Sequence, residues 1–217
     1  MTVFNIAVTA DTVCPFCYAA TKQISNAIAA YAEKNPASSN EFKIRWNPFF
    51  LMADPPKPSV DKHDYMISKY GAEMLERIDS AQAKLAKEHG INFSKTGKVG
   101  DTLDSHRLIM FAGTRSGVLQ QKVISGVYKS HFEDGLDLAE PKILLKIAAD
   151  AGLPEDETAA WLASEAGVSE VNTKATEARA AGITSVPNIS VSGHDIGTQR
   201  DVQSFLDVFK KVENSSA

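Results

Sequence analysis

The feature that most constrains the fold is the segment Cys14–Cys17 (CPFC), because it separates a strand-like stretch from a helix-like one. Residues 3–9 alternate between apolar and other side chains, which is the period of a strand. From residue 15 to residue 34 the apolar side chains recur at helical spacing, and alternation returns at residues 42–46. Strand, helix and strand in this order predict a βαβ unit with two parallel strands.

A long region without strand signals follows this unit. The proline-rich stretch 54–58 breaks the pattern and predicts a boundary, and almost no strand signal occurs between residues 62 and 182. Helices are expected there at residues 74–89, 103–111, 119–127, 141–151, 155–164 and 169–181.

The strand pattern returns after Gly182. We expect a strand at 188–191, a turn at 192–195, a short pairing strand at 196–197 and a last helix capped by Thr198 or Gln199. The chain is therefore predicted to be an α/β protein (βαβ…ββα) interrupted by a large all-α insertion. The α/β domain would comprise residues 1–58 and 183–217, and the insertion domain residues 59–182.

The composition limits which cellular compartment and which binding partners are expected for this protein. The chain has 23 basic and 27 acidic residues, a net charge of −4, which gives no reason to expect nucleic acid or an anionic membrane as a partner. No apolar stretch approaches the roughly 20 residues that span a bilayer, and the start lacks the pattern of a secretory signal. We expect a cytoplasmic protein, in which a CxxC pair is catalytic or redox-sensing rather than a structural disulfide.

The two cysteines are the only ones in the chain, so they cannot complete a tetrahedral zinc site, and no metal is expected. Cys14 falls at the expected N-cap with Pro15 in the first helical position, where the unpaired N–H groups stabilise a thiolate. Cys14 is predicted to face outward and attack a substrate disulfide, and Cys17, one turn further in, to resolve the mixed disulfide. The alternative is a pair of buried, unreactive thiols.

A second element of the site is expected at Ser185-Val186-Pro187. An X-Pro bond that is cis at the start of a strand would present a backbone edge beside the sulfurs, on which an extended peptide can pair. A trans proline that merely begins the strand is the alternative.

These motifs carry a family resemblance. Residues 11–18 (DTVCPFCY) resemble the D-x-V-C-P-W-C-Y start of the FrnE family, residues 105–107 (SHR) its N-T-x-x-A-H-R segment, and residues 182–187 (GITSVP) its G-V-x-G-V-P segment. Together with the helical insertion, the set resembles the DsbA-type branch of the thioredoxin superfamily over residues 4–212.

The resemblance implies a thioredoxin fold and thiol–disulfide oxidoreduction on disulfide-containing or dithiol proteins or peptides. Cys14 would be the nucleophile, Cys17 the resolving thiol and Pro187 the cis-proline, with Val186 and Phe16 contacting the substrate. No bound cofactor is implied, and glutathione or a thioredoxin-type system would be the electron partner.

The chain departs from the family pattern in three places. Phe16 replaces the usual Trp, Asn188 replaces an aromatic residue after the Val-Pro pair, and Asp104-Ser105 stands where Ala precedes His-Arg. Phe16 also stands where periplasmic DsbA relatives have a histidine that stabilises the thiolate. We therefore expect a less acidic Cys14, and a potential more negative than the roughly −120 mV of the strongly oxidising class.

Several residues have two interpretations. Asp11 is expected either to relay protons near the sulfurs or to be a solvated cap. His106 and Arg107 would face the cleft or, as favoured, brace the seam between insertion and core. The stretch 49–52 is expected mainly in the core, although it could wall an apolar cleft. The other histidines are expected on the surface or in turns, at positions 63, 89, 131 and 194.

Two other functions stay open on the sequence. One is a glutathione-dependent transferase or isomerase, because kappa-class glutathione transferases and 2-hydroxychromene-2-carboxylate isomerases are similar in plan. Those relatives typically have a serine where Cys14 stands, so the retention of Cys14 and Cys17 favours dithiol chemistry. The other is a non-enzymatic redox sensor or holdase.

Overall fold

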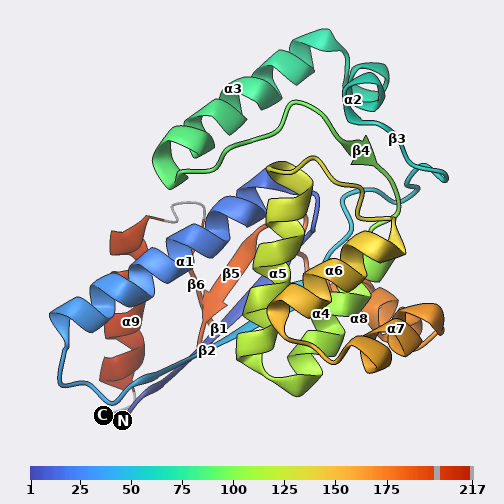
Figure 1. Cartoon of the computed structure of the whole chain (residues 1–217). Coiled ribbons are helices and arrows are strands. Elements are labelled where there is room, and N and C mark those ends of the chain that lie inside the picture. Colours follow the sequence, from blue (N-terminus) through green and yellow to red (C-terminus); the bar gives the residue numbers. More distant parts are fainter. Residues whose placement is uncertain (198–200, 216–217) are drawn as a thin grey trace.

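The computed structural model describes residues 1–197 and 201–215. The strands are β1 (Val3–Ala10), β2 (Glu41–Pro48), β3 (Val60–Asp61), β4 (Lys98–Val99), β5 (Asn188–Val191) and β6 (His194–Asp195). The helices are α1 (Pro15–Lys34), α2 (Lys62–Tyr70), α3 (Ala72–His89), α4 (Leu103–Arg115), α5 (Gly117–Phe132), α6 (Pro141–Ala151), α7 (Glu155–Ala163), α8 (Val168–Ala180) and α9 (Val202–Ser215). The expected class, a βαβ…ββα core interrupted by helices, is confirmed (Figure 1). The cap expected at Thr198 or Gln199 lies outside the described residues.

The main sheet has the strand order β2-β1-β5-β6. β1 and β2 run parallel from Val3↔Glu41 to Ala10↔Pro48, as predicted, and β5 pairs antiparallel with β1. The carboxyl end of β1 therefore lies next to the start of β5. This arrangement brings the CPFC segment, which follows β1, to the segment that precedes β5.

The short pairing strand was predicted wrongly. It is β6 at His194–Asp195, not residues 196–197, because the turn contains only Ser192 and Gly193. Both turn residues have positive φ, 47° and 86°. A two-residue turn of this kind matches the twist of the two flanking strands, so pairing resumes at once.

An aromatic cluster fixes one face of the sheet. Phe4 of β1 stacks on Phe42 of β2, with ring centroids 4.8 Å apart, and also contacts Tyr31 of α1 and Phe209 of α9. Phe4 and Phe209 are completely buried. Burying an aromatic side chain stabilises the fold by about 1.5–3 kcal/mol, so this cluster holds α1 and α9 on the same face of the sheet (Figure 1).

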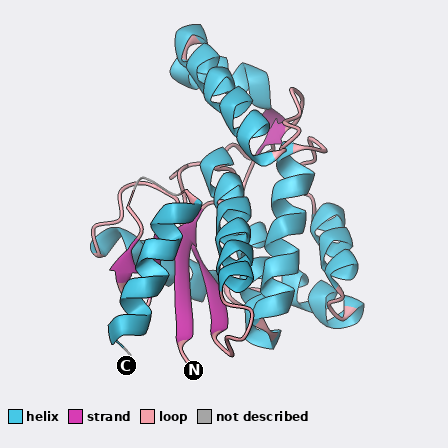
Figure 2. Ribbon diagram, turned by 90° about the vertical axis from the view of Figure 1, so that its left-hand side faces the viewer, coloured by secondary structure: helices cyan, strands magenta, loops and turns pink. Residues whose placement is uncertain are grey.

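The insertion is helical apart from one two-residue ladder, in which β3 pairs with β4. The prediction of an all-α insertion missed this ladder, because two residues are too short for a periodic signal. It also missed α2, a helix of nine residues in which no residue is buried. The α2–α3 pair projects from the rest of the molecule (Figures 1 and 2). The domain boundaries at 58/59 and 182/183 stay a prediction.

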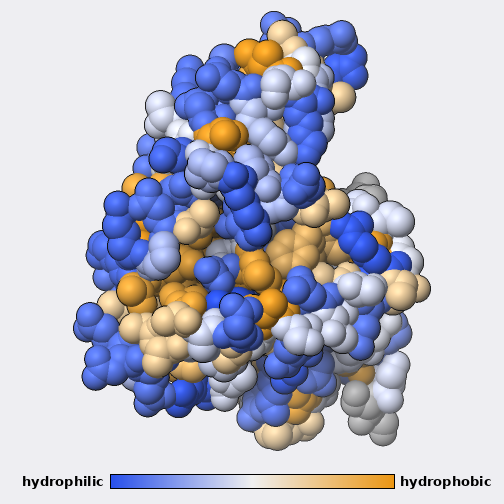
Figure 3. Space-filling model, turned by 90° about the vertical axis from the view of Figure 1, so that its right-hand side faces the viewer, coloured by the Kyte–Doolittle hydropathy of each residue, from blue (hydrophilic) through white to orange (hydrophobic). Residues whose placement is uncertain are grey.

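The surface of this projection differs from the surface beneath it. Hydrophilic residues dominate the α2–α3 pair, whereas apolar residues gather on the face below it (Figure 3). Among the described helices, none combines the length and apolar character needed to cross a membrane.

Candidate active site

Cys14 occupies the N-cap of α1, as predicted. Its backbone is extended (φ −96°, ψ 114°), Pro15 begins the helix, and no side chain caps the first turn. The Cys14 carbonyl accepts hydrogen bonds from the N–H groups of Cys17 (3.0 Å) and Tyr18 (3.2 Å). The positive end of the helix therefore lies at the Cys14 sulfur, where it favours a thiolate.

Both thiols are free and buried, with 3% of Cys14 and none of Cys17 exposed. The prediction that Cys14 faces outward is therefore wrong, because the segment before β5 covers its sulfur: the Cys14 Sγ donates to the Val186 carbonyl at 3.7 Å. The order predicted for the pair, with Cys17 the deeper thiol, is confirmed.

The two thiols have opposite pKa shifts. A hydrogen bond from the Cys17 thiol lowers the pKa of Cys14 and outweighs the opposing effect of burial. Burial raises the pKa of Cys17 well above its usual value, and its hydrogen bond to Cys14 and the charge of Asp11 raise it further. At neutral pH the proton therefore stays on Cys17, and Cys14 is the thiol prepared to act as nucleophile.

The Val186–Pro187 peptide bond is cis, as predicted. Pro187 is buried, Val186 is half-buried, and β5 begins at the next residue. Phe16, in contrast, is 46% exposed beside the two buried thiols. The Cys14 sulfur thus contacts the backbone carbonyl that immediately precedes the cis-proline.

Asp11 is a buried carboxylate beneath the thiols, and not a solvated cap. It is 1% exposed and accepts hydrogen bonds from the N–H groups of Val13 (3.1 Å) and Leu51 (2.6 Å). His106 approaches the same carboxylate, with Nε2 3.6 Å from Oδ1. The Asp11 side chain thus connects the turn before α1, the loop after β2 and helix α4.

Tyr128 is a residue of the site that the sequence analysis missed. It is completely buried, and its hydroxyl donates to the Asp11 carbonyl at 3.2 Å. Its ring stacks on Tyr18, with centroids 5.4 Å apart, and burial raises its pKa well above the usual value. The helical spacing Ile124–Tyr128 was a signal for burial, but nothing local indicated contact with residue 11.

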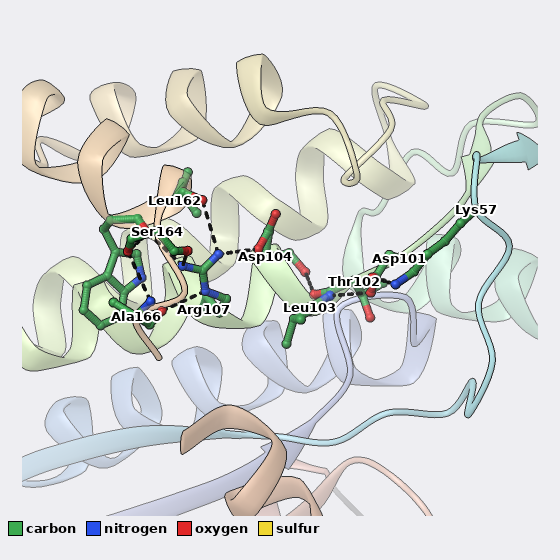
Figure 4. A network of polar contacts seen from close by, with 11 residues as sticks. Lys57, Asp101, Thr102, Leu103, Asp104, Arg107, Leu162, Ser164 and Ala166 are labelled. Carbon is green, nitrogen blue, oxygen red and sulfur yellow. Dashed lines mark hydrogen bonds and ion pairs between the residues drawn. The ribbon is translucent and has the colours of Figure 1, made fainter. Parts of the chain in front are cut away.

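Arg107 braces the insertion internally, and not the seam between insertion and core as the sequence analysis favoured (Figure 4). It is 2% exposed, and its guanidinium pairs with Asp104 at 2.6 Å. The same group donates to the backbone carbonyls at the end of α7 and just beyond it: Trp161 (2.7 Å), Leu162 (3.3 Å), Ser164 (2.5 Å) and Ala166 (2.9 Å). Arg107 therefore joins α4 to α7 and does not face the thiols.

His106 is also buried, with 4% of its surface exposed, and its ring meets that of Phe50 edge-on at 4.9 Å. Part of the stretch 49–52 lies in the core, as expected, and part of it is exposed. Phe49 is in the core, with 1% exposed, whereas Leu51 is 49% exposed next to the hydrogen bond that its N–H makes to Asp11.

One prediction about the other histidines is wrong. His131 is 5% exposed, because it continues the buried face of α5. Burial and the nearby charge of Lys62 lower its pKa to about 4. His63 is exposed, and one ligand atom each from Asp61, His63 and Asp64 lie within 4.8 Å of one another. This group on the surface is distant in sequence from the thiols and does not enter their chemistry.

Comparisons with known proteins place this geometry in a class. The profile of the DsbA-like thioredoxin domain matches residues 5–210. A thioredoxin fold with a dithiol at a helix start and a cis-proline beside it defines the class, and the chain belongs to the DsbA-like thioredoxin family. A search of curated proteins returned no significant match.

Solved structures share the fold at low sequence identity. A probable DsbA oxidoreductase from Streptomyces coelicolor superposes with a TM-score of 0.82 at 22% identity, over 97% of this chain and 90% of that one. A 2-hydroxychromene-2-carboxylate isomerase gives 0.68 at 12% identity, over 98% and 96%. The cytosolic disulfide reductase DsbM from Pseudomonas aeruginosa, solved with GSH, gives 0.66 at 15% identity, over 97% and 98%. At these identities the likeness concerns the fold.

Proposed function

We propose that the protein is a thiol–disulfide oxidoreductase that exchanges disulfides with protein or peptide substrates through Cys14 and Cys17. The observation that carries this proposal is the asymmetry of the two thiols: Cys14 lies at the N-cap of α1 against the carbonyl that precedes the cis-proline, whereas Cys17 lies inside the helix with no exposed surface, and their pKa values shift in opposite directions. A structural pair of buried thiols has no need of this asymmetry, whereas a nucleophile and its resolving partner do.

In the reducing direction, the Cys14 thiolate attacks one sulfur of a substrate disulfide. A Cys14–substrate disulfide forms, and the other substrate sulfur leaves as a thiolate that takes up a proton. Cys17 then loses its proton and attacks the Cys14 sulfur, which releases the second substrate thiolate and leaves a Cys14–Cys17 disulfide. The substrate gains two electrons and the protein loses two. The same steps in reverse oxidise a substrate dithiol.

We infer a substrate site around the exposed Phe16 and the Val186–Pro187 segment. The Val186 carbonyl already accepts from the Cys14 sulfur at 3.7 Å, so an extended peptide that pairs with this edge brings its own sulfur to Cys14. The 46% exposed Phe16 and the 49% exposed Leu51 offer apolar contact to the residues next to the substrate cysteine.

We assign Asp11 the role of proton acceptor in the second step, with His106 positioned beside it. Cys17 must lose a proton in a buried site, and its pKa is raised. The Asp11 carboxylate is buried near both thiols, with His106 Nε2 3.6 Å away. Once Cys14 is part of the mixed disulfide and carries no negative charge, the Asp11 carboxylate can take the proton from Cys17, whose sulfur then attacks Cys14.

For the setting, we propose a cytoplasmic protein of the FrnE type that exchanges electrons with glutathione or a thioredoxin-type system. The DsbM structure with GSH supports glutathione as the first partner to test. The chain's net charge of −4 argues against nucleic acid as a partner. Glutathione-dependent isomerisation and redox sensing without turnover are outcomes that the following experiment separates.

The test measures insulin reduction and the refolding of a scrambled disulfide substrate by the protein and by its Cys14→Ala and Cys17→Ala variants. We expect activity only in the unmodified protein, and a trapped mixed disulfide in Cys17→Ala but not in Cys14→Ala. Glutathione conjugation that survives in Cys17→Ala, with both disulfide assays inactive, would overturn the proposal in favour of an isomerase or transferase. A change of conformation on oxidation without any turnover would favour a sensor.

A further inference from the structure

Tyr128 is a buried hydroxyl that the two steps of disulfide exchange leave without a task. It belongs to α5, in the insertion, and reaches the turn between β1 and α1, where its hydroxyl donates to the Asp11 carbonyl at 3.2 Å. Its ring stacks on Tyr18 of α1 and meets Trp46 of β2 edge-on, with centroids 5.4 and 6.3 Å away. The side chain has no exposed surface, so this packing fixes the position of the hydroxyl.

The backbone of Asp11 joins Tyr128 to both thiols. The Asp11 carbonyl accepts from the Cys14 N–H at 3.2 Å as well as from the Tyr128 hydroxyl. Burial raises the pKa of Cys17, and a hydrogen bond from the Asp11 N–H to its sulfur acts in the opposite direction. A carbonyl oxygen has two lone pairs, so it keeps the bond from Cys14 when the tyrosine hydroxyl turns away. The hydroxyl can therefore change its acceptor without leaving the Asp11 carbonyl unpaired.

The electrostatics of Tyr128 reflect the same neighbours. Burial raises the pKa of Tyr128 well above its usual value, and the charge of Cys17 raises it further. The charges of Cys14 and Asp11 and a hydrogen bond with the Cys17 sulfur act in the same direction. A thiolate that raises the pKa of a phenol holds it in the protonated form, in which the phenol is a donor to that thiolate. Tyr128 therefore keeps its proton throughout the reaction.

The second step of the exchange creates a charge where water has no access. Cys17 has no exposed surface, and it must become a thiolate before it attacks Cys14. A buried anion is costly unless hydrogen-bond donors face it. The Asp11 N–H supplies one donor to this sulfur, and the Tyr128 hydroxyl is placed to supply a second.

We propose that Tyr128 is a catalytic residue of the second step, in which its hydroxyl turns from the Asp11 carbonyl to the Cys17 sulfur as that sulfur becomes a thiolate. In the disulfide exchange proposed above, on which this role depends, Cys17 gives its proton to the Asp11 carboxylate. Its electron pair then forms the bond to the Cys14 sulfur, while the bond from Cys14 to the substrate breaks and the substrate sulfur leaves as a thiolate. Tyr128 donates to Cys17 only between these events, so it lowers the barrier and leaves the equilibrium between dithiol and disulfide unchanged.

Dithiobis(nitrobenzoate) tests this role, because this disulfide releases one coloured thiolate in each step. The first is released when Cys14 forms the mixed disulfide, and the second when Cys17 resolves it. The reagent is added in sufficient excess that the rate of the second release no longer depends on its concentration. In Tyr128→Phe we expect the first rate to be unchanged and the second to fall by roughly tenfold to a hundredfold, the contribution of one hydrogen bond to a charged group. The redox potential, measured by equilibration with glutathione, should stay the same.

Tyr18→Phe is the matched control, since Tyr18 stacks on the same ring but its hydroxyl bonds Glu133 at the end of α5. Both of its rates should equal those of the unmodified protein. A ring-fluorinated tyrosine at position 128 retains the hydroxyl as a stronger donor, so its second release should be at least as fast as that of the unmodified protein.

Three results would overturn the role of Tyr128: an unchanged second rate in Tyr128→Phe, an equal slowing in Tyr18→Phe, or a slower second release with the fluorinated tyrosine. If the unmodified protein releases only the first thiolate, the dithiol mechanism itself is wrong, and the proposed function fails with it.

Discussion

At the scale of single residues, the asymmetry between Cys14 and Cys17 arises from their positions in one helical turn. Cys14 is the N-cap, so the N–H groups of the first turn and the Cys17 thiol all favour its thiolate. Cys17 lies inside the helix with no exposed surface, where burial disfavours charge. Three positions of separation are enough to shift the pKa values of two chemically similar groups in opposite directions.

This asymmetry predicts the effect of removing the Cys17 thiol. In Cys17→Ala the pKa of Cys14 should rise, because the hydrogen bond that lowers it is lost while burial, which raises it, remains. Cys17→Ser should show a smaller rise, since the hydroxyl can still donate. The pH dependence of alkylation of Cys14 by iodoacetamide measures both, and equal pKa values in Cys17→Ala and the unmodified protein would contradict the assignment.

The presence of Phe16 leads us to expect a moderate redox potential for the Cys14–Cys17 pair. The CPFC dipeptide has no histidine to stabilise the Cys14 thiolate, so the potential should be more negative than about −120 mV. Equilibration with glutathione measures it. In Phe16→His the potential should rise, because a protonated imidazole stabilises the reduced form, and a fall on this substitution would count against the argument.

At the scale of elements, helix α4 connects the candidate active site to the rest of the insertion. Ser105, His106 and Arg107 are consecutive and all buried, and each contacts a different element. The Ser105 hydroxyl bonds that of Thr12, before α1, at 2.9 Å, the His106 ring meets Phe50 in the loop after β2, and Arg107 holds the end of α7. The SHR segment is therefore a junction of three elements more than a part of the reactive centre.

The contribution of Arg107 can be measured against a matched arginine on the same helix. Arg115 also connects α4 to α7, through Glu157, but it is 41% exposed at the side chain. We expect Arg107→Lys to lower the free energy of unfolding by about 2–4 kcal/mol, because a lysine leaves buried carbonyls unpaired. Arg115→Lys should change it by no more than about 0.5 kcal/mol. Denaturant unfolding of both variants gives the comparison. Similar losses of unfolding free energy in the two variants would contradict the bracing role of Arg107.

At the scale of the whole molecule, burial makes folding stability depend on pH. His131 has a pKa of about 4 in the folded protein, against an ordinary value of 6.5, so the unfolded chain binds the proton more readily. Above pH 6.5 His131 is neutral in both the folded and the unfolded chain, so it does not make the free energy of unfolding depend on pH there. As the pH falls from 6.5 towards 4, the free energy of unfolding should decrease by about 3 kcal/mol on account of this residue alone.

The measurement compares chemical unfolding from pH 7 down to about 4 in the unmodified protein and in His131→Gln, where the decrease due to this residue should disappear. His194→Gln is the control, because His194 is exposed. Parallel pH profiles for His131→Gln and the unmodified protein would show that His131 is not buried as a neutral group.

The sequence by itself determined the order of the elements and the position of the dithiol at the start of a helix. Periodicity, Asn35-Pro36 after α1 and Gly152 after α6 are local signals, and they predicted the main helices, the parallel β1–β2 pair and Cys14 at the start of α1. Such signals extend over a few residues, which is why they missed α2 and misplaced β6.

Only the tertiary structure decided what surrounds the sulfurs. Thr12 meets Ser105 across 93 positions and Tyr128 meets Asp11 across 117, and no local pattern reports contacts at such separations. The burial of Cys14 under Val186 and the Arg107 contacts with α7 have the same origin. Each depends on how distant segments pack, because the environment of a side chain is set by its neighbours in space.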